Sequence, residues 1–226
     1  MQEISWKDNL RIAWFGCFLT GASISLVVPF MPIFVEQLGI EGDQVAFYSG
    51  LAISVSAISA AVVSPIWGIL ADKYGRKPMM IRAGLAMTIT MGGLAFVPNV
   101  FWLLFLRFLN GVFTGFVPNA TALIASQVPK DRSGYALGTL STGVVAGTLT
   151  GPFVGGFIAE IFGIRNVFLL VGGFLFLAAI LTILFIKENF QPVPKEKALP
   201  TKELFTSVKY PFLLINLFLT SFVIQF

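Results

Sequence analysis

Long apolar segments alternate with short polar interruptions along the chain, and this pattern predicts membrane-spanning helices. A helix needs about 20 mostly apolar residues to cross a bilayer. Six segments approach or exceed this length, running roughly over residues 12–35, 45–70, 81–97, 100–127, 136–162 and 167–186. A seventh apolar segment begins at Phe212 and reaches Phe226, which is too short for a span.

The interruptions between the apolar segments are short and rich in glycine, proline and charge, which is typical of turns. They fall at residues 39–43, 71–77, 98–99, 129–134 and 163–166. Such short connections place consecutive spans antiparallel. We therefore expect an all-α membrane protein, with a six-helix bundle over residues 1–186. Residues 187–211, which combine three prolines with lysines and glutamates, are expected to be a linker, and residues 212–226 the start of a second bundle.

The composition agrees with this class and excludes several others. Of the 226 residues, 56% are hydrophobic and 12% charged, against about 25% charged in soluble domains. The absence of histidine and the single Cys17 exclude an intrachain disulfide and a histidine or multi-cysteine metal site. We expect no metal and no cofactor. No G-x-x-x-x-G-K-[ST] phosphate loop is present, which disfavours an ATP-driven pump, and the lack of histidine and of clustered acids disfavours an enzyme.

The positive residues predict the orientation in the membrane, because cytoplasmic loops carry an excess of lysine and arginine. Thirteen of the 15 fall on one side of the six predicted spans, and only Arg165 falls on the other. This places the N-terminus and the linker in the cytoplasm, and explains the basic character without nucleic-acid binding. The thirteen are Lys7, Arg11, Lys73, Arg76, Lys77, Arg82, Lys130, Arg132, Lys187, Lys195, Lys197, Lys202 and Lys209. The N-terminal apolar segment is too long for a signal peptide, so we expect an uncleaved first helix.

An internal repeat is visible at the ends of the second and fifth apolar segments. The second ends in Pro-x-x-Gly-x-x-Ala-Asp-x-Tyr-Gly-x over residues 65–76. The fifth ends in a similar series, with one extra residue, over residues 152–165. One copy ends on the predicted cytoplasmic side and the other on the outer side. This is the pattern of an inverted three-plus-three repeat, which is found in secondary transporters.

Arg107 lies inside the fourth apolar segment, where a charged side chain must face protein or water. A continuous helix would place Arg107, Asn110, Gly111, Thr114, Pro118 and Thr121 on one stripe, with Phe105, Leu109, Val112 and Phe116 opposite. Two interpretations stay open. The arginine either lines a functional cavity or is held by a neighbouring backbone carbonyl. No acidic residue lies deep in the six segments to pair with it.

Glycine and proline residues mark two further segments. The fifth carries glycines at four-residue spacing, followed by Pro152, which permits close helix contact and a softened helix. Such a face is either a plain packing interface or one that slides. Pro29 and Pro32 are expected to bend the outer third of the first segment.

Several of these motifs together resemble the major facilitator superfamily. The series Gly68-x-Leu-Ala-Asp72-Lys-x-Gly75-Arg76-Lys77 resembles its cytoplasmic loop signature at every defining position. Arg107 with Asn110 and Gly111 resembles its fourth-helix arginine motif, with Asn where Gln is usual. Gly147, Gly151, Pro152, Gly155 and Gly156 resemble the fifth-helix antiporter motif of exporters. The stretch from Gly21 through Pro29 to Pro32 resembles the first-helix motif of twelve-helix drug:proton antiporters.

This resemblance implies the N-terminal half of a proton-coupled multidrug efflux pump of the bacterial plasma membrane. Its implied partners are hydrophobic or cationic drugs, protons, the lipid bilayer and a C-terminal six-helix half. Asp72 and Arg76 would latch the cytoplasmic side and Gly68 would touch the other half. Arg107, with Thr114 on the same face, would assist proton coupling, while Gly151 and Pro152 would flex.

One departure concerns the proton carrier. The acidic residue that many such antiporters carry in the first helix is missing, because Glu36 and Glu160 lie at outer ends of their helices, so the carrier is unidentified. A metabolite or sugar exporter on the same scaffold and a non-transporting truncated remnant remain as alternatives.

Overall fold

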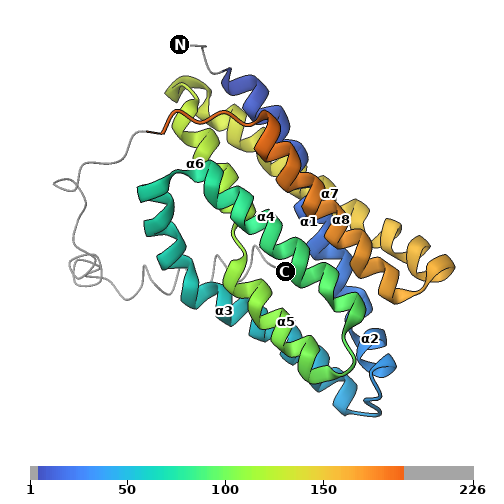
Figure 1. Cartoon of the computed structure of the whole chain (residues 1–226). Helices are drawn as coiled ribbons and strands as arrows, with labels where there is room; N and C mark the ends of the chain where they lie inside the picture. The colour runs from blue at the N-terminus through green and yellow to red at the C-terminus, as the bar shows by residue number, and fades with distance from the viewer. Residues whose placement is uncertain (1–4, 191–226) are drawn as a thin grey trace, which may run out of the picture. The chain divides into compact units, whose positions relative to one another are not determined.

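A computed structural model describes residues 5–190, which fold into helices long and apolar enough for six membrane spans (Figure 1). The number and order of the predicted spans are confirmed. The predicted second-bundle start at 212–226 and the linker beyond Phe190 lie outside the described residues. The elements are α1 (Trp6–Val27), η1 (Val28–Phe30), α2 (Met31–Gln37), α3 (Gln44–Tyr74), α4 (Arg76–Gly93), η2 (Leu94–Phe96), α5 (Val100–Phe113), α6 (Phe116–Gln127), η3 (Lys130–Arg132), α7 (Ser133–Phe162) and α8 (Ile164–Phe185).

Two of the predicted turns are much shorter than the sequence pattern indicated. Residues 71–77 were expected to be a polar turn, but α3 continues to Tyr74 and α4 begins at Arg76. Only Gly75 leaves helical geometry, with φ +99°, which side chains rarely adopt. The third span therefore starts at Arg76, and Arg82 lies inside it and not in a loop. Likewise only Gly163 separates α7 from α8.

The fourth span is broken where the sequence pattern predicted continuity. Helix α5 ends at Phe113 and α6 begins at Phe116, with Gly115 at φ +127° between them. The predicted stripe therefore holds only in α5, where Arg107 and Asn110 are buried. Past the break the register changes. Phe116, predicted to lie opposite the Arg107 stripe, is 1% exposed, whereas Pro118 on the predicted stripe is exposed.

The first span changes from α-helix to a short 3₁₀ turn at the two prolines, where a bend is expected. Pro29 lies in the 3₁₀ turn η1, and Pro32 lies at the start of α2. A proline in the first turn of a helix removes no hydrogen bond that the helix would otherwise make.

The helix pairing has the symmetry of an inverted repeat. Helix α1 packs along α7 and α3 packs along α5, while α4 packs on α8. Exchanging the first three spans with the last three converts the α1–α7 pair into the α5–α3 pair. Gly75 and Gly163 also match, because each donates its N–H to the carbonyl of the alanine four residues earlier, at 2.9 and 3.0 Å. Figure 1 shows α4 between the α3–α5 pair and α8.

Two hydrophobic clusters fill the bundle, one towards each end. The cluster around Phe34 and Phe168 joins α2, α4, α5 and α8. The cluster around Leu10 and Phe116 joins α1, α6, α7 and α8. Large apolar side chains such as Phe101, Phe153 and Leu184 remain exposed on the outside, as expected of helices that lipid surrounds.

Candidate functional site

The turn between α3 and α4 is held by a carboxylate from the far end of the described chain. The side chain of Glu188, which follows α8, accepts the backbone N–H groups of Arg76 and Lys77, each at 2.8 Å. These N–H groups belong to the first turn of α4. The N-cap residue of α4 is Gly75, which has no side chain to accept them. A negative charge is favourable there because unpaired N–H groups and the helix dipole both attract it. Glu188 therefore caps α4.

Gly75 is required by this arrangement for two reasons. Its φ of +99° is one that other residues adopt only with strain. A methyl group on it would also lie 2.8 Å from the Glu188 carboxylate and 3.2 Å from the Phe190 ring. The glycine of the loop motif thus clears space for the cap.

The charged residues of the loop motif surround this cap. The Arg76 guanidinium pairs with the Asp72 carboxylate one turn earlier on α3, and both are partly exposed. The Lys77 ammonium donates to the Ile183 carbonyl at 3.1 Å, which ties α4 to the last turn of α8. Gly68 lies on α3 with no atom within 4 Å of where a side chain would begin, so its face is open among the described residues.

Arg107 is buried between three helices. Its side chain on α5 is 5% exposed. Its Nε donates to the Ala52 carbonyl on α3 at 3.3 Å, and Nη1 lies 3.7 Å from the Met91 sulfur on α4. Of the two interpretations left open by the sequence, the structure shows the second, an arginine held by the backbone carbonyl of a neighbouring helix. Over residues 5–190 no carboxylate pairs with it, and it does not line the pocket described below.

The neighbouring site residues of α5 also face protein. The Asn110 side-chain oxygen accepts from the Thr90 hydroxyl of α4 at 3.2 Å. A methyl group on Gly111 would overlap backbone and side-chain atoms of Ser56 and Ser59, so α3 and α5 meet closely there. Thr114 follows the last residue of α5, and its carbonyl can accept a partner from another helix because the fourth span is interrupted at Gly115.

That partner is Arg82, which the sequence reasoning had placed in a cytoplasmic loop. Its Nη2 donates to the Thr114 carbonyl at 3.1 Å. Its guanidinium carbon lies 3.4 Å from the centre of the Trp67 ring, a close stacking contact. Trp67 in turn donates its indole N–H to the Val112 carbonyl at 2.6 Å. Arg82 thus joins α3, α4 and the break between α5 and α6.

The glycine motif of α7 packs directly on the backbone of α1. Methyl groups on Gly143 and Gly151 would lie 2.7 and 2.6 Å from the carbonyl oxygens of Trp14 and Ala22, and one on Gly147 would overlap the Phe18 carbonyl. The contact is reciprocal, because Gly21 of α1 approaches the Val144 carbonyl in the same way, at 2.6 Å. The predicted first-helix and fifth-helix motifs are therefore two faces of one interface.

Not every motif residue takes part in this contact. Gly155 meets the Leu26 and Phe30 side chains, but Gly156 has nothing within 4 Å. Pro152 lies inside α7, which stays continuous around it. The predicted site residues thus form three separate groups, which are the α3–α4 turn, the buried α5 face and the α1–α7 interface.

Two important residues escaped the sequence reasoning. Glu188 gave no local signal, because its partners lie more than 100 positions earlier. One local signal could have suggested a distant cap. Gly75 precedes α4 and has no side chain that could cap the first N–H groups of the helix. Arg82 was misplaced because it followed a charged loop, although it lies one and a half turns or more inside the third span.

Comparison with known proteins settles the family. The sequence profile described as Major Facilitator Superfamily matches residues 13–226. The chain belongs to the major facilitator superfamily. The resemblance inferred from the motifs and the expected six-helix N-terminal bundle are thereby confirmed, and the chain is a multi-pass membrane protein of a transporter family.

Curated relatives match along the whole chain. The Multi-drug resistance efflux pump PmrA of Streptococcus pneumoniae (strain ATCC BAA-334 / TIGR4) is 87% identical over 226 residues, which are 100% of this chain and 57% of PmrA. The Multidrug resistance protein MdtG of Proteus mirabilis (strain HI4320) is 50% identical over 98% of this chain and 55% of its own length. The chain therefore spans little more than half the length of these relatives.

A solved structure shares the fold. The human organic anion transporter MFSD10 (TETRAN) superposes with a TM-score of 0.72 at 16% identity, covering 88% of this chain and 52% of MFSD10. The similarity in sequence is low, so this match bears on the fold alone.

Proposed function

We propose that the chain is the N-terminal half of a proton-coupled multidrug efflux transporter of the bacterial plasma membrane. It would export hydrophobic and cationic drugs by alternating access, together with a second six-helix half. The observation that carries this proposal is the 87% identity to an efflux pump over all 226 residues. The motif residues also support it, because they gather in the α3–α4 turn, on the buried face of α5 and at the α1–α7 interface.

The orientation proposed is N-terminus in the cytoplasm. Arg82 no longer counts as a loop charge, because it lies inside α4. In the described part of the chain, eight positive residues lie at or near the ends of the spans on the N-terminal side, against Arg165 on the other. The eight are Lys7, Arg11, Lys73, Arg76, Lys77, Lys130, Arg132 and Lys187. This imbalance supports the positive-inside assignment.

The α3–α4 turn is proposed to act as the inner latch. The Asp72–Arg76 pair is partly exposed, and such i,i+4 pairs contribute only about 0.3–0.5 kcal/mol. A contact of this size biases two states without locking either. The open face at Gly68 would receive a helix of the second half when the cytoplasmic side closes.

Arg107 is proposed to support proton coupling from a buried position. Its two contacts are a long hydrogen bond to a carbonyl and a weak sulfur contact, whereas an arginine carries five N–H donors. Donor capacity remains for a carboxylate. Bringing a carboxylate near Arg107 would lower that group's proton affinity, and the carboxylate would come from outside the six helices.

The α1–α7 interface is proposed to be the surface that yields during the transport cycle. Glycines let the two backbones touch without interlocking side chains, so small sliding displaces few packed groups. Pro152 removes one backbone hydrogen bond from α7 close to this contact.

Drug susceptibility of cells that express the complete reading frame tests this proposal. Asp72→Asn and Arg107→Ala should each reduce resistance to several hydrophobic cations, while membrane levels of the protein stay unchanged. Unchanged resistance in both variants would refute the roles given to these residues. Resistance to no drug, together with export of a sugar or metabolite, would favour the alternative exporter.

A further inference from the structure

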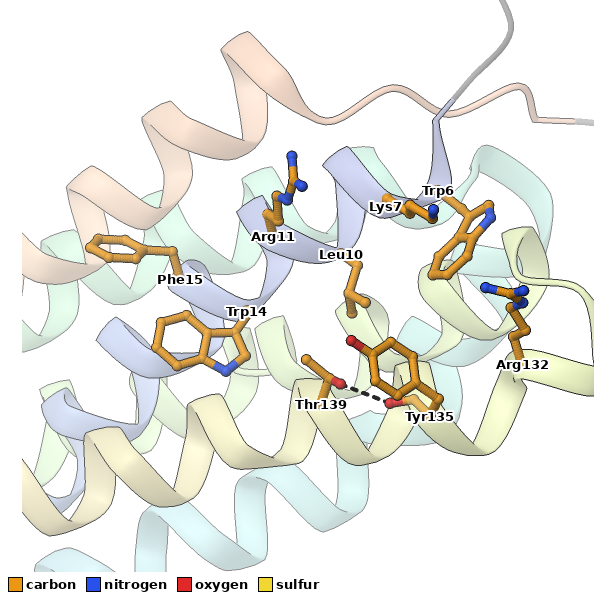
Figure 2. Close-up of a pocket in the computed structure, with 9 residues that line it drawn as sticks. All are labelled: Trp6, Lys7, Leu10, Arg11, Trp14, Phe15, Arg132, Tyr135 and Thr139. Carbon is orange, nitrogen blue, oxygen red and sulfur yellow. Dashed lines mark hydrogen bonds between the residues drawn. The ribbon is translucent and has the colours of Figure 1, made fainter.

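A pocket of about 650 Å³ lies between the first turns of α1 and α7, next to the Trp14–Gly143 contact of the glycine interface. Figure 2 shows Leu10 of α1 and Tyr135 of α7 pointing into the space between the two helices, with Trp6 and Trp14 on either side of them. Phe15 lies farther along α1, and the Arg11 side chain points away from α7. Its full lining is Trp6, Lys7, Leu10, Arg11, Trp14, Phe15, Arg132, Tyr135 and Thr139. The pocket combines aromatic walls with three basic side chains.

The basic and the aromatic residues of the pocket lie at different depths in the bilayer. The first span runs from Trp6 to Gln37, so at 1.5 Å per residue Arg11 lies about 16 Å from its middle and Trp14 about 11 Å. The hydrocarbon half-thickness is about 15 Å. The Lys7 and Arg11 positions therefore reach the headgroup layer, whereas the Trp14 and Phe15 positions lie beside acyl chains. Arg132 is the third residue of the fifth span, Lys130–Phe162, and lies about 21 Å from the middle of that span, which is also headgroup depth.

The charges in the pocket favour an anion. Three basic side chains line the pocket and two carboxylates lie beside them, so the group as a whole is positive. Asp8 pairs with Arg11 at 3.1 Å, and Asp131 lies 3.8 Å from Arg132, both exposed to solvent. Exposed pairs of this kind are weak and exchange partners readily. Lys7 is not paired with a carboxylate among the described residues, and lies 5.8 Å above the Trp6 ring.

We propose that this pocket binds an anionic phospholipid, with the phosphodiester held between Lys7 and Arg132, and with Arg11 adding positive charge from another face of α1. The Trp6 indole and the Tyr135 hydroxyl supply neutral donors at the same depth, and Trp14 and Phe15 contact the first part of an acyl chain. Basic pockets between spanning helices recognise anionic headgroups in this manner. A cationic drug is disfavoured because the three basic side chains outnumber the two aspartates beside them, which leaves the cluster positive. The inference does not depend on the proposed drug export.

Tryptophan quenching by brominated lipids tests the site in the 226-residue chain. The chain has four tryptophans, of which Trp6 and Trp14 line the pocket, so a W67F/W102F background reports on the pocket. In bilayers of phosphatidylcholine, dibrominated phosphatidylglycerol should quench far more strongly than dibrominated phosphatidylcholine at the same mole fraction. Each basic group near an anionic headgroup contributes about fivefold in affinity. With two arginines partly offset by aspartates, we expect a selectivity of about tenfold or more.

Three variants separate the site from general surface charge and from misfolding. Lys7→Gln/Arg11→Gln/Arg132→Gln should bring the selectivity close to one, whereas the charge-retaining Lys7→Arg/Arg11→Lys/Arg132→Lys should keep most of it. Lys195→Gln/Lys197→Gln/Lys202→Gln removes the same charge from the predicted linker and should leave the selectivity unchanged.

Four results would overturn the proposal. They are equal quenching by the two lipids in the parent chain, equal losses in the pocket and linker variants, displacement of the lipid by excess inorganic phosphate, and displacement by a cationic dye.

Discussion

Two hydrogen-bond distances between Glu188 and the start of α4 predict how far loss of this side chain lowers the local stability of α4. Its carboxylate accepts the Arg76 and Lys77 N–H groups, both at 2.8 Å. Glu188→Ala removes a charged acceptor from two helix N-terminal donors that have no other cap. Hydrogen bonds to charged groups contribute about 1.5–3 kcal/mol each and an N-cap about 1 kcal/mol. Because the site is half-exposed, we expect a local loss of about 2 kcal/mol.

Hydrogen exchange measured by mass spectrometry on the detergent-solubilised chain reads this loss directly. A change of about 2 kcal/mol corresponds to about a 30-fold faster exchange of the first-turn amides of α4. Glu188→Gln, which keeps an oxygen acceptor but loses the charge, should fall between the parent and the alanine variant. Exchange in α5, which Glu188 does not touch, should not change.

Glu160→Ala is the matched control. Glu160 is an exposed carboxylate near the end of α7, and no hydrogen bond to its side chain occurs in the described part of the chain. Its loss should alter α4 exchange by less than about threefold, the usual range for surface substitutions. If Glu188→Ala falls within that same range, the capping argument is wrong.

Three further predictions concern helix contacts. Gly147→Ala places a methyl group against the α1 backbone and should cost about 1–3 kcal/mol, lowering the melting temperature in detergent by several degrees. Gly156→Ala, with open space around it, should not lower it. Gly68→Val should abolish drug resistance from the complete transporter while the isolated chain melts unchanged, and a lower melting temperature would argue against an interhalf contact. Arg82→Gln removes the stacked cation and should speed amide exchange around Thr114 at the end of α5, and unchanged exchange there would contradict its bracing role.

The sequence could reveal those parts of the fold that depend on local pattern. Spans follow from runs of apolar residues, and the interruption of the α-helix at Pro29 follows from proline geometry. Glycines at four-residue spacing indicated the α1–α7 interface, because this spacing puts them on one helix face and lets two helix backbones approach closely in a membrane. The inward side of Arg107 followed from the cost of exposing a charge to lipid.

What the sequence could not reveal depends on contacts between distant segments. The α3–α4 turn was expected to occupy seven residues, because a run of charges usually indicates a loop. It occupies one residue, since Arg76 and Lys77 are helical once Glu188 caps them. The break at Gly115 was missed because a single glycine within an apolar segment is usually tolerated in a helix. Side chains from outside α5 satisfy the carbonyls at the break, since Arg82 donates to the Thr114 carbonyl and Asn119 donates to the Gly115 carbonyl.

The three groups of site residues have different physical roles in this account. The turn at Gly75 is rigidly capped but carries a weak, exposed ion pair beside it. Arg107 is buried and only loosely bonded. The glycine interface is close but smooth. A transporter needs weakly held elements of this kind on a stable frame, because its states must differ by only a few kcal/mol.

Proton movement driven by drug is the most direct test of the central claim. Everted membrane vesicles carrying the complete transporter would be energised to form an internally acidic pH gradient, followed by a pH-sensitive dye. Adding a hydrophobic cationic drug should partly collapse the gradient, and Arg107→Ala vesicles with equal protein content should not respond. A gradient that the drug leaves untouched, or that falls equally with the Arg107→Ala protein, would contradict proton-coupled export through this bundle.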